Sequence, residues 1–312
     1  MALPEMLRRR LRLPMVGAPM FLVSGPALVA AQCRAGIIGA FPALNARPRE
    51  RLVDWLAELA ESLGDAAAPF AVNLIVHRSN DRLEHDLRAC VEARVPLVIT
   101  SLGARPDVND AIHGYGGLVL HDVTDDRFAR KAIEKGADGL VAVAVGAGGH
   151  AGALSPFALV AEIRRWFDGP LALAGAIATG EGVLAAEAMG ADLAYVGSPF
   201  IATTEAQADP AYRAMVVAGG AGDIVNTDHF SGIPANYLAA SVRAAGFDPD
   251  ALPATRGTLD LSADGAGPKA WRDIWSAGQG IGAVDAVRPA GERIRAMAEA
   301  YRRCRRALAD TG

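Results

Sequence analysis

The stretch Val141-Ala-Val-Ala-Val145-Gly-Ala-Gly-Gly-His150-Ala-Gly152 places one imidazole in a loop that carries almost no other side chain. Its first five residues form an apolar, partly β-branched run, which predicts a strand. Four glycines and two alanines then share residues 146–152 with His150. Glycine adopts φ > 0 at little cost and lets a backbone approach a flat ligand closely. The pattern therefore makes His150 the candidate acid or base of an active site.

Working outward from this strand, short apolar runs alternate with helical patterns along the first 200 or so residues. The expected strands are residues 15–18, 37–41, 70–76, 96–100, 117–120, 138–145, 171–174 and 192–196. The expected helices are residues 26–34, 49–63, 81–93, 108–113, 126–135, 156–167 and 182–189. Continuous apolar strands are typical of a parallel sheet that is covered on both faces. Eight strand–helix units predict an α/β protein with a (β/α)8 TIM barrel, and a doubly wound sheet is the alternative.

The pattern changes after the eighth strand, and this change predicts three parts. Residues 1–206 would hold the eight barrel strands. Residues 207–271 would form a mostly helical insertion or lid, with helices at 211–219 and 235–245 and a Pro/Gly/Asp-rich stretch at 246–267. Residues 272–312 would return to close the barrel with a helix at 290–309.

Composition narrows the class of protein. Of the 312 residues, 51% are apolar, which is ample for a core, and the net charge of −4 argues against nucleic acid as a partner. Cys33, Cys90 and Cys304 share no metal-ligand or disulfide spacing, so we expect no metal site and a reducing compartment. The N-terminus does not resemble a signal peptide, and no apolar run reaches the length of a membrane span. We expect a cytoplasmic protein.

Polar and small residues gather at the predicted carboxyl ends of the strands, where barrel active sites lie. They are Met20, Asn73, Ser101, His121, His150, Gly175 and Gly197-Ser198. Asn73 interrupts an apolar run, and a buried amide needs hydrogen-bond partners that a ligand can supply. The alternative is that Asn73 bonds only to neighbouring backbone.

Two glycine-containing loops, residues 174–180 and 196–200, follow the seventh and eighth strands. Barrels often bind phosphate at this place with loop amides and a helix N-terminus, and tight turns are the plainer explanation. Two other segments, 146–151 and 278–283, fit a loose dinucleotide fingerprint. No acidic residue ends the strand at 171–174 to hold a ribose, and the second segment follows no clear strand, which argues against a Rossmann site.

Taken together, these motifs resemble the nitronate monooxygenase family, formerly called 2-nitropropane dioxygenases, which are FMN-dependent TIM barrels. The resemblance rests on residues 17–20 (GAPM), 72–74 (VNL), His121, 148–152 (GGHAG), 174–180 (AGAIATG), 197–200 (GSPF), 231–237 (SGIPANY) and 274–280 (IWSAGQG). The matching pieces occur in the right order over most of the chain.

The resemblance implies FMN as cofactor and His150 as the catalytic base over the flavin. The cofactor-binding residues that it implies are Ala18, Pro19, Met20, Asn73, His121, Gly148, Gly149, Gly175, Ala176, Gly180, Gly197, Ser198 and Gln279. Among these, Gly175, Gly180, Gly197 and Ser198 would hold the phosphate. Many members carry a lysine directly after the histidine of the fifth strand, and this chain has Asp122 there. The implied partners are a small-molecule substrate and O2, with no nucleic acid and no membrane; a homodimer is left open.

Three functions remain open from the sequence. The first is oxidation of alkyl nitronates with O2, in which the flavin carries the redox chemistry and the protein supplies orientation and electrostatics. The second is an NAD(P)H-dependent FMN oxidoreductase that acts on a quinone or an enoyl thioester on the same fold. The third is a barrel that keeps the loops without catalysis.

Overall fold

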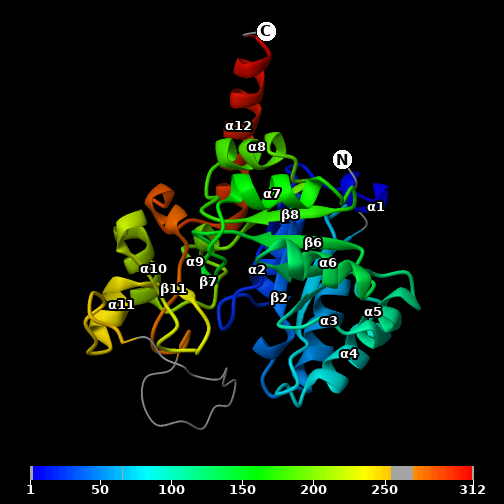
Figure 1. Cartoon of the computed structure of the whole chain (residues 1–312). Helices are drawn as coiled ribbons and strands as arrows, with labels where there is room; N and C mark the ends of the chain where they lie inside the picture. Colours follow the sequence, from blue (N-terminus) through cyan, green and yellow to red (C-terminus); the bar gives the residue numbers. More distant parts are fainter. Residues whose placement is uncertain (1–2, 65, 254–269, 311–312) are drawn as a thin grey trace.

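The chain folds into a closed barrel of eight parallel strands surrounded by helices, with an insertion at one side (Figure 1). The computed structural model describes residues 3–64, 66–253 and 270–310. The strands follow one another around the barrel in the order β1-β2-β3-β4-β5-β6-β8-β9, and every neighbouring pair is parallel. This arrangement confirms the (β/α)8 barrel and excludes the doubly wound sheet.

Each barrel strand lies within three residues of its predicted range. The strands are β1 (Met15–Gly17), β2 (Ile38–Pro42), β3 (Phe70–Ile75), β4 (Leu97–Ser101), β5 (Leu118–Val123), β6 (Gly139–Val143), β8 (Leu171–Ala174) and β9 (Leu193–Val196). The helices that follow them are α2 (Pro26–Ala35), α3 (Arg51–Ser62), α4 (Leu83–Glu92), α5 (Pro106–His113), α6 (Asp126–Glu134), α7 (Pro156–Arg164), α8 (Gly180–Ala188) and α9 (Ser198–Ile201). A short 3-10 helix, η1 (Ala43–Asn45), lies between β2 and α3.

Alternation along each strand separates two apolar layers, because successive side chains of a strand point to opposite faces. One layer fills the inside of the barrel and includes Ile99, Leu120 and Val141, all fully or almost fully buried. The other layer lies between strands and helices and includes Val98 and Val119. Residues just before and within α1 (Glu5–Arg8) join the inner layer, so the N-terminal segment closes the amino end of the barrel. The carboxyl end is left for the loops that follow the strands.

The insertion builds a small antiparallel sheet as well as helices. It contains α10 (Pro210–Ala218), η2 (Ala221–Asp223), β10 (Ile224–Thr227), β11 (Ala235–Leu238) and α11 (Ala239–Ala244). The helix expected at 235–245 is therefore wrong in its first four residues, because these pair with β10 on one side and with β7 (Gly149–His150) on the other. Pairing with distant strands overrides a local helical pattern. Most of the predicted stretch at 246–267 lies outside the described residues.

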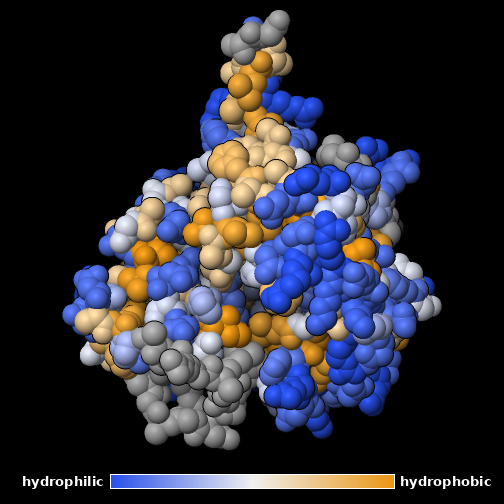
Figure 2. Space-filling model, viewed as in Figure 1, coloured by the Kyte–Doolittle hydropathy of each residue, from blue (hydrophilic) through white to orange (hydrophobic). Residues whose placement is uncertain are grey.

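The C-terminal segment returns to the barrel through η3 (Gln279–Ala283) and ends in α12 (Ala290–Ala309). Helix α12 packs against α8 and α2, and its last turns extend beyond α8 (Figure 1). Hydrophilic residues cover the side with α4, α5 and α6, whereas hydrophobic ones appear on the side of α10 and α11 (Figure 2). Among the helices of the described ranges, none has both the length and the apolar character needed to cross a bilayer.

Candidate active site

His150 lies just beyond the carboxyl end of β6, in a loop that the insertion converts into a strand. In the β7–β11 ladder, His150 is opposite Ala235 and Gly149 is opposite Asn236. The Ala151 amide continues this pairing by donating to the carbonyl oxygen of Pro234 at 3.3 Å. These bonds satisfy backbone groups that a free loop would leave to water. The backbone of the candidate catalytic residue is thus fixed by residues about 85 positions further along the chain.

The same loop is also tied to the C-terminal segment. The Gly149 amide donates to Ser276 Oγ at 2.8 Å, and Ser276 Oγ donates in turn to the carbonyl oxygen of Asn236. The side chain of Asn236, which is buried, donates through Nδ2 to the carbonyl oxygen of Ala147 at 2.6 Å. Ser276 and Asn236 therefore hold the loop on both sides of the glycine pair, although both lie far from the 148–152 motif in the sequence.

The imidazole of His150 is half-buried and meets the ring of Trp271 edge to face, with ring centroids 5.0 Å apart. Its Nε2 atom is buried and has no hydrogen-bond partner among the described residues. Burial lowers the pKa of His150 from 6.5 to about 4, because the charged form loses its hydration. At neutral pH the ring is uncharged, so one of its nitrogens is an acceptor that can take a proton.

The two glycines before His150 have different reasons to be glycine. A methyl group on Gly148 would lie 2.9 Å from the backbone nitrogen of Gly278 and 3.1 Å from the carbonyl carbon of Ala277. Residue 148 is therefore small because another backbone segment packs against it. Gly149 has a φ of 72°, which disfavours side chains, and no atom lies within 4 Å of the place a side chain would take. Of the two glycines, only Gly149 leaves open space beside the imidazole.

Several predicted cofactor residues come together at the carboxyl ends of β1, β8 and β9. A methyl group on Gly197 would lie 3.5 Å from both Ala18 Cβ and Met20 Sδ, so these three positions are adjacent. Pro19 lies between Ala18 and Met20 in the same loop. Ser198 Oγ accepts a hydrogen bond from the Gly278 amide at 2.8 Å, which links this cluster to the C-terminal segment.

The loop after β8 joins the same region. The carbonyl oxygen of Gly146 accepts from the amides of both Ala176 and Gln279, at 3.2 and 2.9 Å. Gly175 and Ala176 have positive φ values of 147° and 54°, so the chain turns sharply there. Positive φ costs an alanine more than a glycine, and such strain is common at binding sites. The loops around Gly146, Ala176 and Gln279 are thus hydrogen-bonded to one another and form one continuous surface.

Helix α8 begins at Gly180 and directs its first amides toward this end of the barrel. Thr179 caps the helix by accepting from the Gly182 amide at 3.1 Å. The other first-turn amides have no acceptor within the helix, which makes this N-terminus suited to an anion. A methyl group on Gly180 would lie 2.0 Å from the carbonyl oxygen of Met297 in α12. The glycine at 180 is therefore required by helix packing, whatever its amide binds.

Inside the barrel, Asn73, Ser101 and Asp122 form a hydrogen-bonded chain across β3, β4 and β5. Asn73 Nδ2 donates to the carbonyl oxygen of Ile99 at 3.0 Å and to Ser101 Oγ at 2.8 Å. Ser101 Oγ donates to Asp122 Oδ2 at 2.5 Å. The other carboxylate oxygen, Oδ1, is buried without a partner among the described residues. Burial raises the pKa of Asp122 from 3.8 to about 6.

His121 lies on the other face of β5. It shares its direction with Val119, which packs under the helices, whereas Leu120 and Asp122 point into the barrel. Its Nδ1 is 2.6 Å from Thr100 Oγ1, and burial lowers the pKa of His121 from 6.5 to about 4. The structure does not bring His121 to the other predicted site residues, because strand alternation turns it outward. Asp122 occupies the inward position.

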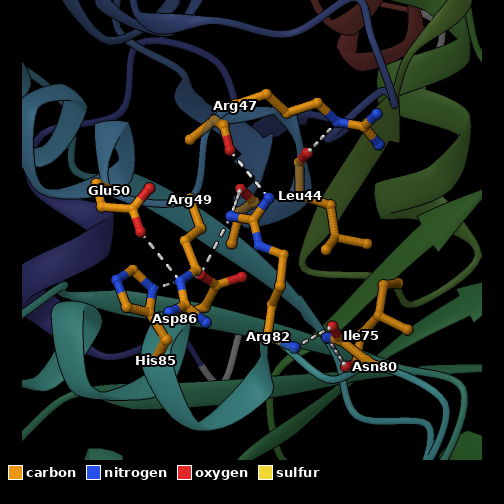
Figure 3. Close-up of polar contacts among 11 residues, drawn as sticks. Leu44, Arg47, Arg49, Glu50, Ile75, Asn80, Arg82, His85 and Asp86 are labelled. Carbon is orange, nitrogen blue, oxygen red and sulfur yellow. Dashed lines mark hydrogen bonds and ion pairs between the residues drawn. The ribbon is translucent and has the colours of Figure 1, made fainter. Parts of the chain in front are cut away.

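A polar network connects the first three loops at the carboxyl end. Arg82, at the start of α4, donates to the carbonyl oxygens of Ala46 and Ala43 at 2.9 and 3.2 Å, and it pairs with Asp86 (Figure 3). Between these two carbonyls, Asn45 donates through Nδ2 to the carbonyl oxygen of Met20 at 2.9 Å. The loop that carries Met20 is therefore fixed by the loops after β2 and β3.

Comparison with known proteins identifies the family of this chain. The nitronate monooxygenase family profile matches residues 7–299. The chain belongs to the nitronate monooxygenase family. It is thereby a flavin-dependent oxidoreductase, as the sequence motifs predict.

Named relatives agree with this family over most of their length. The chain is 28% identical to the nitronate monooxygenase of Paraburkholderia phytofirmans, with 76% of each chain covered. It is also 28% identical to that of Pseudomonas aeruginosa, with 93% of this chain and 96% of the relative covered. Among solved structures, a mutant of FabK from Thermotoga maritima superposes with a TM-score of 0.79 at 25% identity, covering 99% of this chain and 98% of that one.

Sequence reasoning missed the residues that support this candidate site from a distance. They are Asn45, Arg82, Asn236, Trp271 and Ser276. Asn236 and Ser276 lie within quoted motifs, and each is a polar residue between two apolar neighbours, which was a usable signal. Asn45 and Arg82 carry no local signal, because their importance depends on which loops meet at the barrel end.

Proposed function

We propose that the protein oxidises alkyl nitronates with O2 and uses FMN as its cofactor. The observation that carries this proposal is the state of His150: an uncharged imidazole with an orphaned buried Nε2, fixed at the carboxyl end of the barrel. A buried polar atom without a partner in a native protein is expected to meet a ligand or to take part in chemistry.

The residues present fit a flavin. Two buried polar atoms, His150 Nε2 and Asp122 Oδ1, have no hydrogen-bond partner among the described residues, and bound polar groups at the carboxyl end of the barrel would supply these partners. The first turn of α8 and the hydroxyl of Ser198 offer donors for a phosphate, and glycine loops beside them leave room for backbone contact. We therefore propose Ala18, Pro19, Met20, Asn73, Gly149, Gly175, Ala176, Gly180, Gly197, Ser198 and Gln279 as the FMN-binding set.

In this proposal His150 is the base. A neutral imidazole can accept the proton on the carbon next to the nitro group of a nitroalkane, which converts the nitroalkane into the nitronate that is then oxidised; a nearby proton acceptor typically contributes about 10²–10⁴-fold to a rate. Trp271 and the ladder with β11 hold the ring and its backbone in one orientation. The bound flavin supplies the electron acceptor, and the apolar surroundings that lower the pKa of His150 also exclude water.

Flavin reduction without oxygen tests the function directly. The purified protein is expected to be yellow, and anaerobic mixing with propionate-3-nitronate or propyl-2-nitronate should bleach the flavin. NADH and NADPH should leave it oxidised. Rapid bleaching by NADH or NADPH would instead establish the NAD(P)H-dependent reductase, and a protein that neither substrate class reduces would contradict both.

One further property is proposed with the function. Because Cys33, Cys90 and Cys304 are free in the described structure, we propose a reducing compartment, the cytoplasm. The oligomeric state, for which the sequence left a homodimer open, is measured by light scattering of the purified protein.

A further inference from the structure

Asp122 is a carboxyl group placed among uncharged groups inside the barrel. Leu120 and Asp122 share one face of β5, and Leu120 belongs to the inner apolar layer. The groups that face Asp122 from other strands are Ser101 on β4, which donates to it, and Tyr195 on β9, whose own pKa its charge helps to raise. His121, its neighbour on β5, faces the helices. In the described structure no cation pairs with this carboxylate.

The direction of the hydrogen bonds in this chain is fixed by its first acceptor. The carbonyl oxygen of Ile99 can only accept, so the nitrogen of the Asn73 amide faces it. The second N–H of that nitrogen donates to Ser101, and Ser101 therefore donates onward to Asp122 Oδ2. Both donors of Asn73 are used, and the atom it has left is the acceptor Oδ1.

The chain thus ends in an acid whose second oxygen has no partner among the described residues. When ionised, Asp122 Oδ1 is an acceptor that needs an N–H or O–H from a ligand; when protonated, the acid offers a donor instead. Leaving a buried carboxylate oxygen unpaired is costly. Burial raises the pKa of Asp122 to about 6, so both forms are accessible close to neutral pH.

The polar edge of a flavin matches both forms. That edge carries an N–H between two carbonyl oxygens, so it can donate to a carboxylate and accept from a carboxylic acid. Reduction increases the electron density of the same ring, and a nearby negative charge opposes this while a neutral acid does not.

We propose that Asp122 pairs with the polar edge of the bound flavin and that its protonation sets the reduction potential of that flavin. This inference rests on the flavin site of the proposed function. It assigns to Asp122 a role that differs from a cation at the same place: as the pH rises, ionisation of Asp122 makes the flavin harder to reduce than the proton uptake of the flavin alone would. Asn73 and Ser101 are the positioning residues that orient the carboxyl group.

The test is an anaerobic spectroelectrochemical titration of the bound flavin between pH 5 and pH 8.5. Wild type, Asp122→Asn, Ser101→Ala and the control Glu134→Gln are compared; Glu134 is an exposed acid on α6, so it tests loss of one charge far from the barrel interior. The difference in potential between variant and wild type is the readout, because it cancels the proton uptake that belongs to the flavin itself.

The potential of Asp122→Asn should equal that of wild type at pH 5 and exceed it at pH 8. The expected gap is a preference for reduced flavin at least about tenfold greater, which is about 30 mV for two electrons. The gap should open around pH 6. Ser101→Ala removes a hydrogen bond that stabilises the carboxylate, so its transition should move to higher pH. Glu134→Gln should follow wild type throughout.

A potential of Asp122→Asn that tracks wild type at every pH, with flavin still bound, would overturn the inference. If Asp122→Asn does not retain flavin, Ser101→Ala decides, and an unmoved transition overturns the inference. A wild-type protein that cannot be loaded with flavin would overturn the proposed function as well, so the two failures are distinguishable.

Discussion

The rings of His150 and Trp271 meet edge to face, with their planes at 84° and their centroids 5.0 Å apart. His150 lies in β7, whereas Trp271 comes after α11, so the two residues are far apart in the sequence. Trp271 itself has a φ of 63°, an uncommon conformation for a bulky residue. Backbone strain at such a residue persists only where surrounding structure enforces it. The contact therefore restricts the rotation of the imidazole, and it makes Trp271 a positioning residue for His150.

Replacing Trp271 should separate positioning from binding. Trp271→Leu removes the aromatic edge contact, which is worth about 0.5–1.5 kcal/mol, and lets the imidazole rotate. We expect kcat with a neutral nitroalkane to fall about 10-fold to 100-fold, the scale of a misplaced catalytic group, with bound flavin unchanged. Trp271→Phe keeps an aromatic ring and should retain most of the activity. Equal activities of the Leu and Phe variants would contradict the positioning role.

Removing the imidazole itself should abolish most turnover. His150→Ala is expected to lower kcat with a neutral nitroalkane, which must first lose its proton, about 10²-fold or more while FMN stays bound. In wild type, the pKa lowered by burial keeps His150 uncharged as the pH falls to about 4, so the acid limb of the kcat/KM profile should lie below 6.5. His113→Gln is the control, since His113 is at the C-terminal end of α5 and pairs with Asp138. Full activity of His150→Ala would refute the assignment.

A negative charge at residue 198 should show whether this loop binds the proposed FMN phosphate. Ser198→Asp sets a carboxylate against the proposed FMN phosphate, whereas Ser198→Asn has nearly the same shape without the charge. Both side chains can accept from the Gly278 amide, as the serine does. Repulsion between like charges should raise the FMN dissociation constant of the Asp variant at least about tenfold over the Asn variant. Equal FMN dissociation constants for the two variants, measured by fluorescence titration, would contradict the placement of the phosphate at this loop.

Alanine substitutions at Gly180 and Gly182, two glycines in one turn of α8, should change the free energy of unfolding in opposite directions. Gly180→Ala would bring Cβ to 2.0 Å from the carbonyl oxygen of Met297, so α8 and α12 must move apart. Overpacking of this kind costs about 1–3 kcal/mol of unfolding free energy. In Gly182→Ala the nearest atom to the new methyl group is the end of the Ile177 side chain at 3.3 Å, and the alanine favours the helix by up to about 1 kcal/mol. Urea unfolding of the flavin-free proteins measures both, and equal stabilities would show that the helices adjust freely.

Asp122 should make the flavin-free protein less stable as the pH rises. Its pKa is about 6 in the folded chain and 3.8 ordinarily, so the folded state binds the proton more tightly. The resulting stability is present below pH 3.8 and is lost as the pH rises through about 6. The difference corresponds to about 3 kcal/mol as an order of magnitude. Asp122→Asn should therefore gain stability over wild type at pH 8 and little at pH 4, and unfolding curves with a constant difference would exclude this origin.

The barrel could be predicted because the sequence signals for each strand lie within or next to that strand. Each strand is a largely apolar run, and the glycine or proline residues that bound it stand beside it in the sequence. Residues 235–238 show the limit, since their neighbours favour a helix and their strand partners lie on β7 and β10. No local pattern encodes a partner that far away. The division of the chain at residues 206 and 271 stays a prediction.

Site residues could be predicted where a single local motif contains them. They could not be predicted where the outcome depends on which face of a strand a side chain occupies or on contacts with distant segments. His150 stands out among glycines, and Met20, Gly197 and Ser198 end strands that meet in the barrel. His121 and Asp122 differ by one residue, and one residue reverses the face of a strand. The apolar run before them fixes which strand they end, but both assignments of the face look alike in a strand that is buried on both sides.

Because β7 pairs with β11, two parts of the chain determine how His150 is placed. Its place in the chain belongs to the barrel, while its backbone geometry is imposed by the insertion. A change in the insertion can therefore reset the acid–base group and leave the strands that would carry the cofactor untouched. Such a division lets a lineage diversify its chemistry by exchanging one surface segment, and it gives a protein engineer the same point of entry.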